Sequence, residues 1–310
     1  MTVALITHPA CLGHDAGPWH PECPDRLRAV LAALEDECFQ PLLREEAPEA
    51  EEAALLRAHP AAHVRSILSR RPPPGRLVQL DPDTAMCDGS AAAALRAAGG
   101  AVLAVDAVME GWASAAFAAI RPPGHHAEPA RAMGFCLFNN AALAAHHARA
   151  RWGLRRVAVV DFDVHHGNGT QAMFADDPSL FYASSHQSPC YPGTGRPEER
   201  GCAGNIVNVP LPPGSGGAEF RAAWEGGILP ALNAFAPELL IVSAGFDAHK
   251  ADPLAELRLE TEDFAWVTRE LVALARRHTG GRLVSLLEGG YDLDALAASV
   301  AAHVRELMIE

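Results

Sequence analysis

Short apolar runs alternate with longer amphipathic segments along this chain. The apolar runs are typical of strands, and they cover residues 2–7, 115–120, 157–160, 180–184, 206–209, 239–242 and 283–287. Apolar residues at helical spacing and capping residues predict helices at 25–37, 49–58, 60–68, 90–111, from 139 or 140 to 152, 218–235, 261–278 and 294–307. Because strands alternate with helices throughout, the pattern predicts an α/β chain, with a three-layer α/β/α sandwich around a mostly parallel sheet.

The run at 157–160 is typical of a buried parallel strand, since all four residues are apolar and three are β-branched. Two carboxylates, Asp161 and Asp163, and two imidazoles, His165 and His166, follow directly. If the extended conformation persists, Asp161, Asp163 and His165 point the same way. Carboxylates beside an imidazole suit zinc or another divalent transition metal. We therefore predict a metal site at the carboxyl end of this strand, where α/β sheets bind ligands.

Three other strands also end in polar residues. The strand at 115–120 leads into Arg-Pro-Pro-Gly-His125-His126, where prolines and a glycine hold two candidate catalytic imidazoles in a rigid loop. The strand at 239–242 is followed by Asp247, the natural third protein ligand of a catalytic zinc site. The last strand ends in Glu-Gly-Gly-Tyr291, where the glycines permit close backbone approach and the phenol can donate to an oxyanion.

Composition and charge narrow the classes of function. The chain has 310 residues, 49% of them hydrophobic, and a formal net charge of −13. Such acidity argues against nucleic acid as a partner and is compatible with cationic substrates such as lysine side chains or polyamines. Seven cysteines without a Cys-x-x-Cys pair indicate neither a disulfide framework nor a thiolate zinc finger. We find no apolar run long enough to span a bilayer and no charged segment before an apolar one at the N-terminus, so we expect a cytoplasmic protein with no membrane partner.

Four motifs occur in order: Arg-Pro-Pro-Gly-His-His from 121, Asp-Phe-Asp-Val-His-His-Gly-Asn-Gly from 161, Ala-Gly-Phe-Asp from 244 and Glu-Gly-Gly-Tyr from 288. With them the chain resembles the histone deacetylase and acetylpolyamine amidohydrolase family, which has the arginase–deacetylase fold. It is most similar to class II deacetylases and the bacterial histone deacetylase-like amidohydrolases. The resemblance extends from His20 to Asp292. It implies one deacetylase-like catalytic domain over residues 1–310, acting as a zinc-dependent amidohydrolase.

The resemblance assigns a role to each residue of these motifs. It implies that Asp163, His165 and Asp247 bind Zn²⁺, that His126 is the general base and acid, with His125 as its electrostatic neighbour, and that Tyr291 polarises the amide carbonyl. A structural potassium site would comprise Asp161, which also pairs with His125, together with Asp163, His165, Ser184 and Ser185. Asn168 would orient His126, and the substrate tunnel would be formed by Gly134, Phe135, Tyr191 and Leu254.

Leu254 bears on the choice of substrate. Polyamine-selective eukaryotic relatives carry a glutamate seven residues after the third zinc ligand, the position that Leu254 occupies here. We therefore expect hydrolysis of acetyl-lysine, in a protein, peptide or small molecule, to the free amine and acetate. The alternatives are an acetylpolyamine amidohydrolase, an inactive metal-bound module that binds acyl-lysine, and a two-manganese ureohydrolase-like enzyme. A homo-oligomer is compatible with the resemblance, and iron(II) is an alternative to zinc at such a mixed site.

Overall fold

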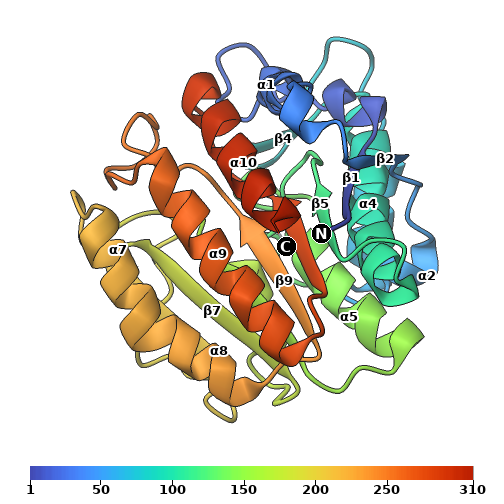
Figure 1. Cartoon of the computed structure of the whole chain (residues 1–310). Coiled ribbons are helices and arrows are strands. Elements are labelled where there is room, and N and C mark those ends of the chain that lie inside the picture. The colour runs from blue at the N-terminus through green and yellow to red at the C-terminus, as the bar shows by residue number, and fades with distance from the viewer. Residues whose placement is uncertain (310) are drawn as a thin grey trace.

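An eight-stranded sheet runs through the centre of the computed structural model, which describes residues 1–309 (Figure 1). The strand order is β2-β1-β5-β10-β9-β6-β7-β8, and the neighbouring strands pair in parallel. The strands are β1 (Val3–Thr7), β2 (Leu43–Glu46), β5 (Ala115–Ala118), β6 (Val157–Asp161), β7 (Leu180–Gln187), β8 (Ile206–Leu211), β9 (Leu239–Ala244) and β10 (Leu283–Leu287).

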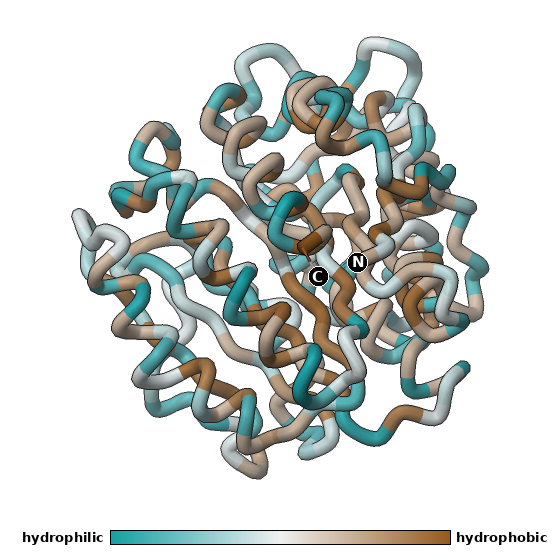
Figure 2. The backbone as a smooth tube through the Cα atoms, in the orientation of Figure 1, coloured by the Kyte–Doolittle hydropathy of each residue, from teal (hydrophilic) through white to brown (hydrophobic). Residues whose placement is uncertain are grey.

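Both faces of this sheet are buried under helices. Along β6, Ala158 and Val160 belong to one apolar cluster and Val157 and Val159 to another, because successive side chains in a strand point to opposite faces. The first cluster includes residues of α1 (Pro24–Ala33), α9 (Thr261–His278) and α10 (Leu293–Met308), and the second includes residues of α4 (Ser90–Glu110) and α5 (Asn140–Trp152). Figure 2 shows the central strands as apolar and the outer loops as mostly hydrophilic. The predicted three-layer α/β/α sandwich is therefore confirmed.

The remaining elements are short and include most of the departures from the predicted pattern. They are η1 (Pro9–Gly13), η2 (Glu37–Phe39), α2 (Glu52–Leu55), α3 (Ala61–Ser69), β3 (Val78–Asp81), β4 (Thr84–Met86), α6 (Asn168–Phe174), α7 (Gly217–Ala223), the π-helical η3 (Trp224–Ile228) and α8 (Leu229–Phe235).

Three of these departures stand out. The antiparallel β3–β4 hairpin lies in a stretch where the sequence pattern indicated no strand. The edge strand β2 is exposed along its whole length, so no apolar pattern marks it. The helix predicted at 218–235 is divided into three pieces by the π-helical turn.

Helix α4 corrects one expectation from the sequence. By length and composition it is apolar enough to cross a membrane, whereas we expected no such run. In this fold it lies beside the sheet and α5 (Figure 1), and more than half of it is buried inside the protein. Small residues such as Gly99 and Gly100 allow this packing, since a Cβ at Gly99 would lie 1.9 Å from the carbonyl oxygen of Pro48. The helix therefore packs as a core helix.

The strand order determines which loops meet. Strands β5, β10, β9 and β6 are consecutive neighbours in the sheet, although they lie far apart in sequence. Because all four are parallel, their carboxyl ends share one edge of the sheet, where open α/β sheets bind ligands. The four polar segments that follow these strands are those singled out in the sequence.

Candidate metal centre and active site

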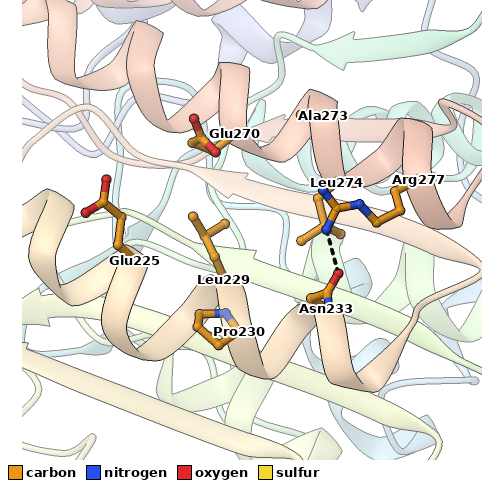
Figure 3. Close-up of a pocket in the computed structure, with 8 residues that line it drawn as sticks. All are labelled: Glu225, Leu229, Pro230, Asn233, Glu270, Ala273, Leu274 and Arg277. Carbon is orange, nitrogen blue, oxygen red and sulfur yellow. Dashed lines mark hydrogen bonds between the residues drawn. The ribbon is translucent and has the colours of Figure 1, made fainter.

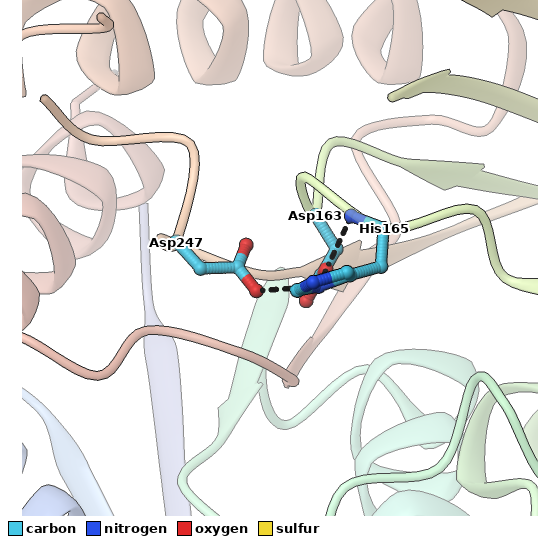
Figure 4. Close-up of side chains that lie close together, drawn as sticks. All are labelled: Asp163, His165 and Asp247. Atoms are coloured by element: carbon cyan, nitrogen blue, oxygen red, sulfur yellow. Dashed lines mark hydrogen bonds and ion pairs between the residues drawn. The ribbon is translucent and has the colours of Figure 1, made fainter. Parts of the chain in front are cut away.

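Two carboxylates and one imidazole converge at the centre of this edge. Nδ1 of His165 lies 3.1 Å from Asp163 Oδ1 and 3.1 Å from Asp247 Oδ2 (Figure 4). Asp163 and Asp247 are 1% exposed and His165 is 7% exposed. Among residues 1–309, these three are the one group of three His, Cys, Asp or Glu residues whose ligand atoms all lie within 4.8 Å of one another.

The chain brings Asp163 and His165 together through tight turns rather than through strand alternation. Strand β6 ends at Asp161, so the extended conformation does not persist through the cluster as we had supposed. Instead, the amide of Asp163 donates to Asp161 Oδ1 at 3.1 Å, and the amide of His165 donates to Asp163 Oδ1 at 2.9 Å. An aspartate that accepts from the amide two residues on curls the chain, and two such turns in succession keep the polar groups close together.

Two glycines make room for the carboxylates. A Cβ at Gly245 would lie 2.0 Å from Asp163 Oδ2, and one at Gly289 would lie 2.1 Å from Asp247 Oδ2. The amide of Gly289 donates to Asp163 Oδ2 at 2.8 Å. The close backbone approach expected of the Glu-Gly-Gly-Tyr motif is therefore confirmed, and its partners are the carboxylates of the cluster.

The residues present fit a divalent metal ion. Burial, together with the neighbouring Asp163 carboxylate, raises the pKa of Asp247 to about 7, which reflects the cost of holding two negative groups together away from water. A divalent cation offsets that charge, and two carboxylates with one imidazole form a three-ligand set of the kind that binds catalytic zinc. The backbone amides of Val164 and Gly289 hold one oxygen of each carboxylate in place.

His125 and His126 stand next to the cluster with opposite electrostatic surroundings. Burial alone would lower the pKa of His125, but Asp163 and Asp161 outweigh it and raise the pKa to about 10. His125 Nδ1 donates to Asp161 Oδ2 at 3.0 Å. Burial and the neighbouring His125 and His165 keep the pKa of His126 well below 6.5. His125 is therefore suited to carry a positive charge, and His126 to act as a neutral base.

Asn168 is the partner of His126, as the sequence predicted. Its Oδ1 lies 2.8 Å from His126 Nδ1, and its Nδ2 donates to Glu128 Oε1 at 2.9 Å. The sequence analysis gave Glu128 no role. In the sequence, Glu128 is marked only by its position two residues after His126. That position does not reveal its contact with Asn168, which lies 40 residues further along the chain.

A pocket of about 210 Å³ leads to these groups. The residues that line it are Asp83, His126, Gly134, Phe135, His165, Tyr191, Leu254 and Tyr291. They include all four predicted tunnel residues. Of the eight, the sequence analysis gave no role to Asp83. Gly134 and Phe135 both have positive φ angles, +57° and +69°, and this backbone turn presents the Phe135 ring to the pocket. Asp83 Oδ1 accepts from the amide of Gly134 at 3.0 Å, so the tip of the β3–β4 hairpin holds this turn.

Tyr291 is held from two sides. Its amide donates to Asp252 Oδ2 at 2.7 Å, and the Arg26 guanidinium lies 4.8 Å from the centre of its ring. Burial keeps the pKa of Tyr291 well above 10, although Arg26 opposes it, so the phenol retains its proton at neutral pH. Neither Asp252 nor the stacking of Arg26 was predicted, because both depend on contacts between distant segments.

A buried ion network lies behind the site. Arg26 and Glu22, four residues apart in the sequence, form a buried salt bridge, with Arg26 Nη1 3.0 Å from Glu22 Oε1. The Glu22 carboxylate also receives two hydrogen bonds from Arg121 of the Arg-Pro-Pro-Gly-His-His motif. Burial alone would raise the pKa of Glu22, but Arg121, His14 and Arg26 lower it to about 2. This network ties the loop after β1 to the loop that presents His125 and His126.

The two serines predicted for potassium lie in β7, the neighbour of β6 on the side away from β9. Ser184 of β7 stands in register with Asp161, and its hydroxyl lies 2.9 Å from His186 Nδ1. Both serines belong to β7, which continues to Gln187, three residues beyond the end predicted at Ser184. The Ser185 hydroxyl accepts from Trp224 Nε1 at 2.9 Å on the opposite face of the sheet. Any contribution of Ser185 near Asp161 therefore comes from its main chain.

A larger hollow, of about 320 Å³, lies between α8 and α9 on the outside of the molecule (Figure 3). Glu225, Glu270, Asn233 and Arg277 supply its polar groups, and Arg277 Nη1 donates to Asn233 Oδ1 at 2.9 Å. None of these four follows a strand end of the central sheet, and the candidate metal ligands are not among the residues that line it. The volume of a pocket therefore does not identify the candidate functional site. The convergence of titratable groups on the smaller pocket does.

Comparisons with known proteins point to one family and one fold. The sequence profile of the histone deacetylase domain matches residues 20–307. The histone deacetylase-like amidohydrolase of Pseudomonas aeruginosa is 40% identical, over 91% of this chain and 79% of its own. The polyamine deacetylase HDAC10 of Mus musculus is 39% identical, over 93% of this chain and 45% of its own. The crystal structure of the HDA15 HD domain superposes with a TM-score of 0.92 at 37% identity, covering 99% of this chain and 88% of that one. The arginase–deacetylase fold is thereby confirmed.

Proposed function

The chain belongs to the histone deacetylase family, and from this premise we propose that it is a zinc-dependent deacetylase that hydrolyses the amide of acetyl-lysine to the free amine and acetate. One observation carries the proposal. A buried Asp-His-Asp ligand set, a histidine held neutral and a protonated tyrosine all meet at one pocket. Amide hydrolysis needs these three components, since it requires an activated water, a base and a donor to the developing oxyanion.

The residues divide the chemistry between them. A zinc ion held by Asp163, His165 and Asp247 would supply Lewis acidity and lower the pKa of a water molecule towards about 7. His126 takes a proton from the attacking water, because its surroundings keep it neutral. The Tyr291 hydroxyl donates to the carbonyl oxygen as negative charge develops on it. His126 or the protonated His125 then gives a proton to the leaving nitrogen, so water and amide become amine and acetate.

The pocket supports a linear acyl-amine substrate. Phe135 and Tyr191 line it, and an exposed Leu254 lies there, at the position where polyamine-selective relatives carry a glutamate. An acetylpolyamine is the second candidate, and the observation that favours it is the Asp83 carboxylate in the same pocket, which would attract a distant ammonium group. We also propose a potassium ion beside Asp161. The proposal is supported by the complete burial of that carboxylate and by its register with Ser184.

Turnover of the zinc-loaded protein on an acetyl-lysine peptide and on N-acetylputrescine, measured side by side, tests this proposal. We expect the peptide to be the better substrate and His126→Ala to abolish turnover of both. Turnover of N-acetylputrescine alone would replace lysine by polyamine as the substrate class, and Asp83→Asn should then raise its KM. The absence of turnover on either compound, with zinc shown to be bound, would contradict the proposed reaction.

A further inference from the structure

The side-chain amide of Asn168 is fixed on both sides. Oδ1 faces His126 Nδ1 at 2.8 Å, and Nδ2 faces Glu128 Oε1 at 2.9 Å and Met133 Sδ at 3.4 Å. Asn168 is 7% exposed, so water has little access to replace either contact. The amide oxygen only accepts hydrogen bonds and the NH₂ group only donates them. The end that faces His126 therefore decides whether His126 Nδ1 must donate or accept.

Glu128 settles the orientation of this amide. An ionised carboxylate only accepts hydrogen bonds, so the Asn168 NH₂ group must point towards Glu128. The Asn168 carbonyl oxygen must then point towards His126, and because this oxygen only accepts, His126 Nδ1 must carry the proton. A neutral imidazole has one N–H, so His126 Nε2 is left as the free base. With the amide reversed, the NH₂ group would donate to Nδ1 and the proton would sit on Nε2.

We propose that Glu128 is a positioning residue that acts through Asn168 to hold His126 in the tautomer with an unprotonated Nε2. The catalytic consequence rests on the proposed function, in which His126 takes a proton from water. An asparagine by itself cannot select the tautomer, because its two ends are nearly equal in shape. The Glu128 carboxylate supplies the missing asymmetry without placing a charge directly on the imidazole.

The chain contains a matched arrangement that serves as a control. On the same helix, α6, Gln171 Oε1 lies 2.9 Å from His166 Nε2, and Gln171 Nε2 donates to Glu199 Oε2 at 2.7 Å. Glu199 and Glu128 are both partly buried, and each accepts from one side-chain amide. His166 is not among the described residues that line the active-site pocket. The two chains of contacts therefore share their chemistry, except that Gln171 Oε1 also accepts from Asn208 Nδ2 at 2.7 Å. They differ in whether the histidine faces the pocket.

The experiment combines kinetics with the tautomeric state of His126. For Glu128→Gln we expect kcat on an acetyl-lysine peptide to fall by about 10- to 100-fold with KM nearly unchanged, as is usual for residues that orient a ligand or base from behind. Glu199→Gln should leave kcat unchanged. In ¹⁵N-histidine spectra of the zinc-loaded protein at neutral pH, His126 should show an unprotonated Nε2 in the wild type and a mixture of tautomers in Glu128→Gln.

A second background separates positioning from general damage. Asn168→Asp presents only acceptor oxygens, so no neighbour is needed to orient it. In that background Glu128→Gln should not lower kcat, and by removing a like charge it should leave kcat equal or raised. An equal loss of kcat in both backgrounds, or an unchanged His126 spectrum in Glu128→Gln, would overturn the inference. If the wild-type protein hydrolyses no acetylated amine, the proposed function fails, while the spectra still decide whether Glu128 sets the tautomer.

Discussion

Replacement of Gly134 by alanine would place a methyl group against His126, the proposed catalytic base. Gly134 has a φ of +57°, and a Cβ at this position would lie 2.4 Å from His126 Cδ2, 2.6 Å from Cγ and 2.8 Å from Cβ. All three atoms belong to one side chain, which is itself held through Asn168. The new methyl group therefore has no flexible neighbour to displace, and either the His126 ring or the Gly134 backbone must move.

The size of the effect follows from these distances. Carbon atoms pack at about 3.5–4.0 Å, so a contact of 2.4 Å requires a shift of about 1 Å. A misplacement of about 1 Å in a catalytic group costs on the order of 10²-fold in rate. An alanine in the left-handed region also costs roughly 1–2 kcal/mol of stability, whatever its surroundings. We therefore expect Gly134→Ala to lower kcat about 100-fold and to lower the free energy of unfolding by roughly 1–2 kcal/mol plus the cost of the contact.

Gly153→Ala is the matched control. Gly153 ends α5 with a φ of +68°, and a Cβ there would meet no atom within 4 Å. It carries the same backbone strain without touching the site, so its Tm should fall by a few degrees while kcat stays at the wild-type value. Turnover on an acetyl-lysine peptide and thermal unfolding of the two variants provide the assay. Near-normal kcat in Gly134→Ala, or an equal loss in Gly153→Ala, would refute the assignment of His126 as the base beside this turn.

Three further perturbations test other parts of the site. Tyr291→Phe should lower kcat by on the order of 10²–10³, as expected for the loss of one oxyanion donor, and near-normal turnover would remove Tyr291 from that role. Gly289→Ala should weaken metal binding about 10- to 100-fold in a chelator competition, because its Cβ would lie 2.1 Å from Asp247 Oδ2, and unchanged affinity would show that Asp247 is not a ligand. Since the pKa of Glu22 is about 2 in the folded protein, against 4.5 for a free side chain, its contribution to stability is complete above pH 4.5 and is lost as the pH falls from 4.5 to 2. That contribution is roughly 3 kcal/mol. Denaturant unfolding of Glu22→Gln should therefore show a lower free energy of unfolding at pH 7 and a flatter pH dependence between pH 4.5 and 2. An unchanged pH dependence would exclude the Glu22 network as the source of the acid sensitivity.

Local sequence pattern was sufficient for most of the central elements and for the residues of the candidate site. The run at 157–160 marks β6 because four apolar residues with three β-branched side chains favour a buried strand over short range. The polar residues directly after β5, β6, β9 and β10 identify the ends of the strands at which ligands bind. The Asn139 cap and the Gly153 stop of α5 are equally local, since each acts on the backbone within a few residues.

The elements that the pattern missed have no local signal of this kind. Strand β2 is exposed along its length and exists only because its backbone pairs with β1. The β3–β4 hairpin is short, and residues of its tip become functional only by meeting the Gly134–Phe135 turn some 51 positions later. Such short segments without an apolar periodicity resemble loops when the partner segment is unknown.

The sequence by itself therefore determined the α/β architecture and indicated the candidate metal ligands and the histidines and tyrosine of the proposed reaction, because periodicity and motif act within one element. Only the tertiary structure decided that β5, β10, β9 and β6 are neighbours, that Arg121 holds Glu22 from 99 positions away, and that Glu128 orients Asn168. The physical reason is that a hydrogen bond or ion pair forms at about 3 Å, whatever the distance along the chain. Sheet order and packing determine which residue becomes the partner of a given amide or charge. Neither leaves a pattern in the residues that neighbour that partner in the sequence.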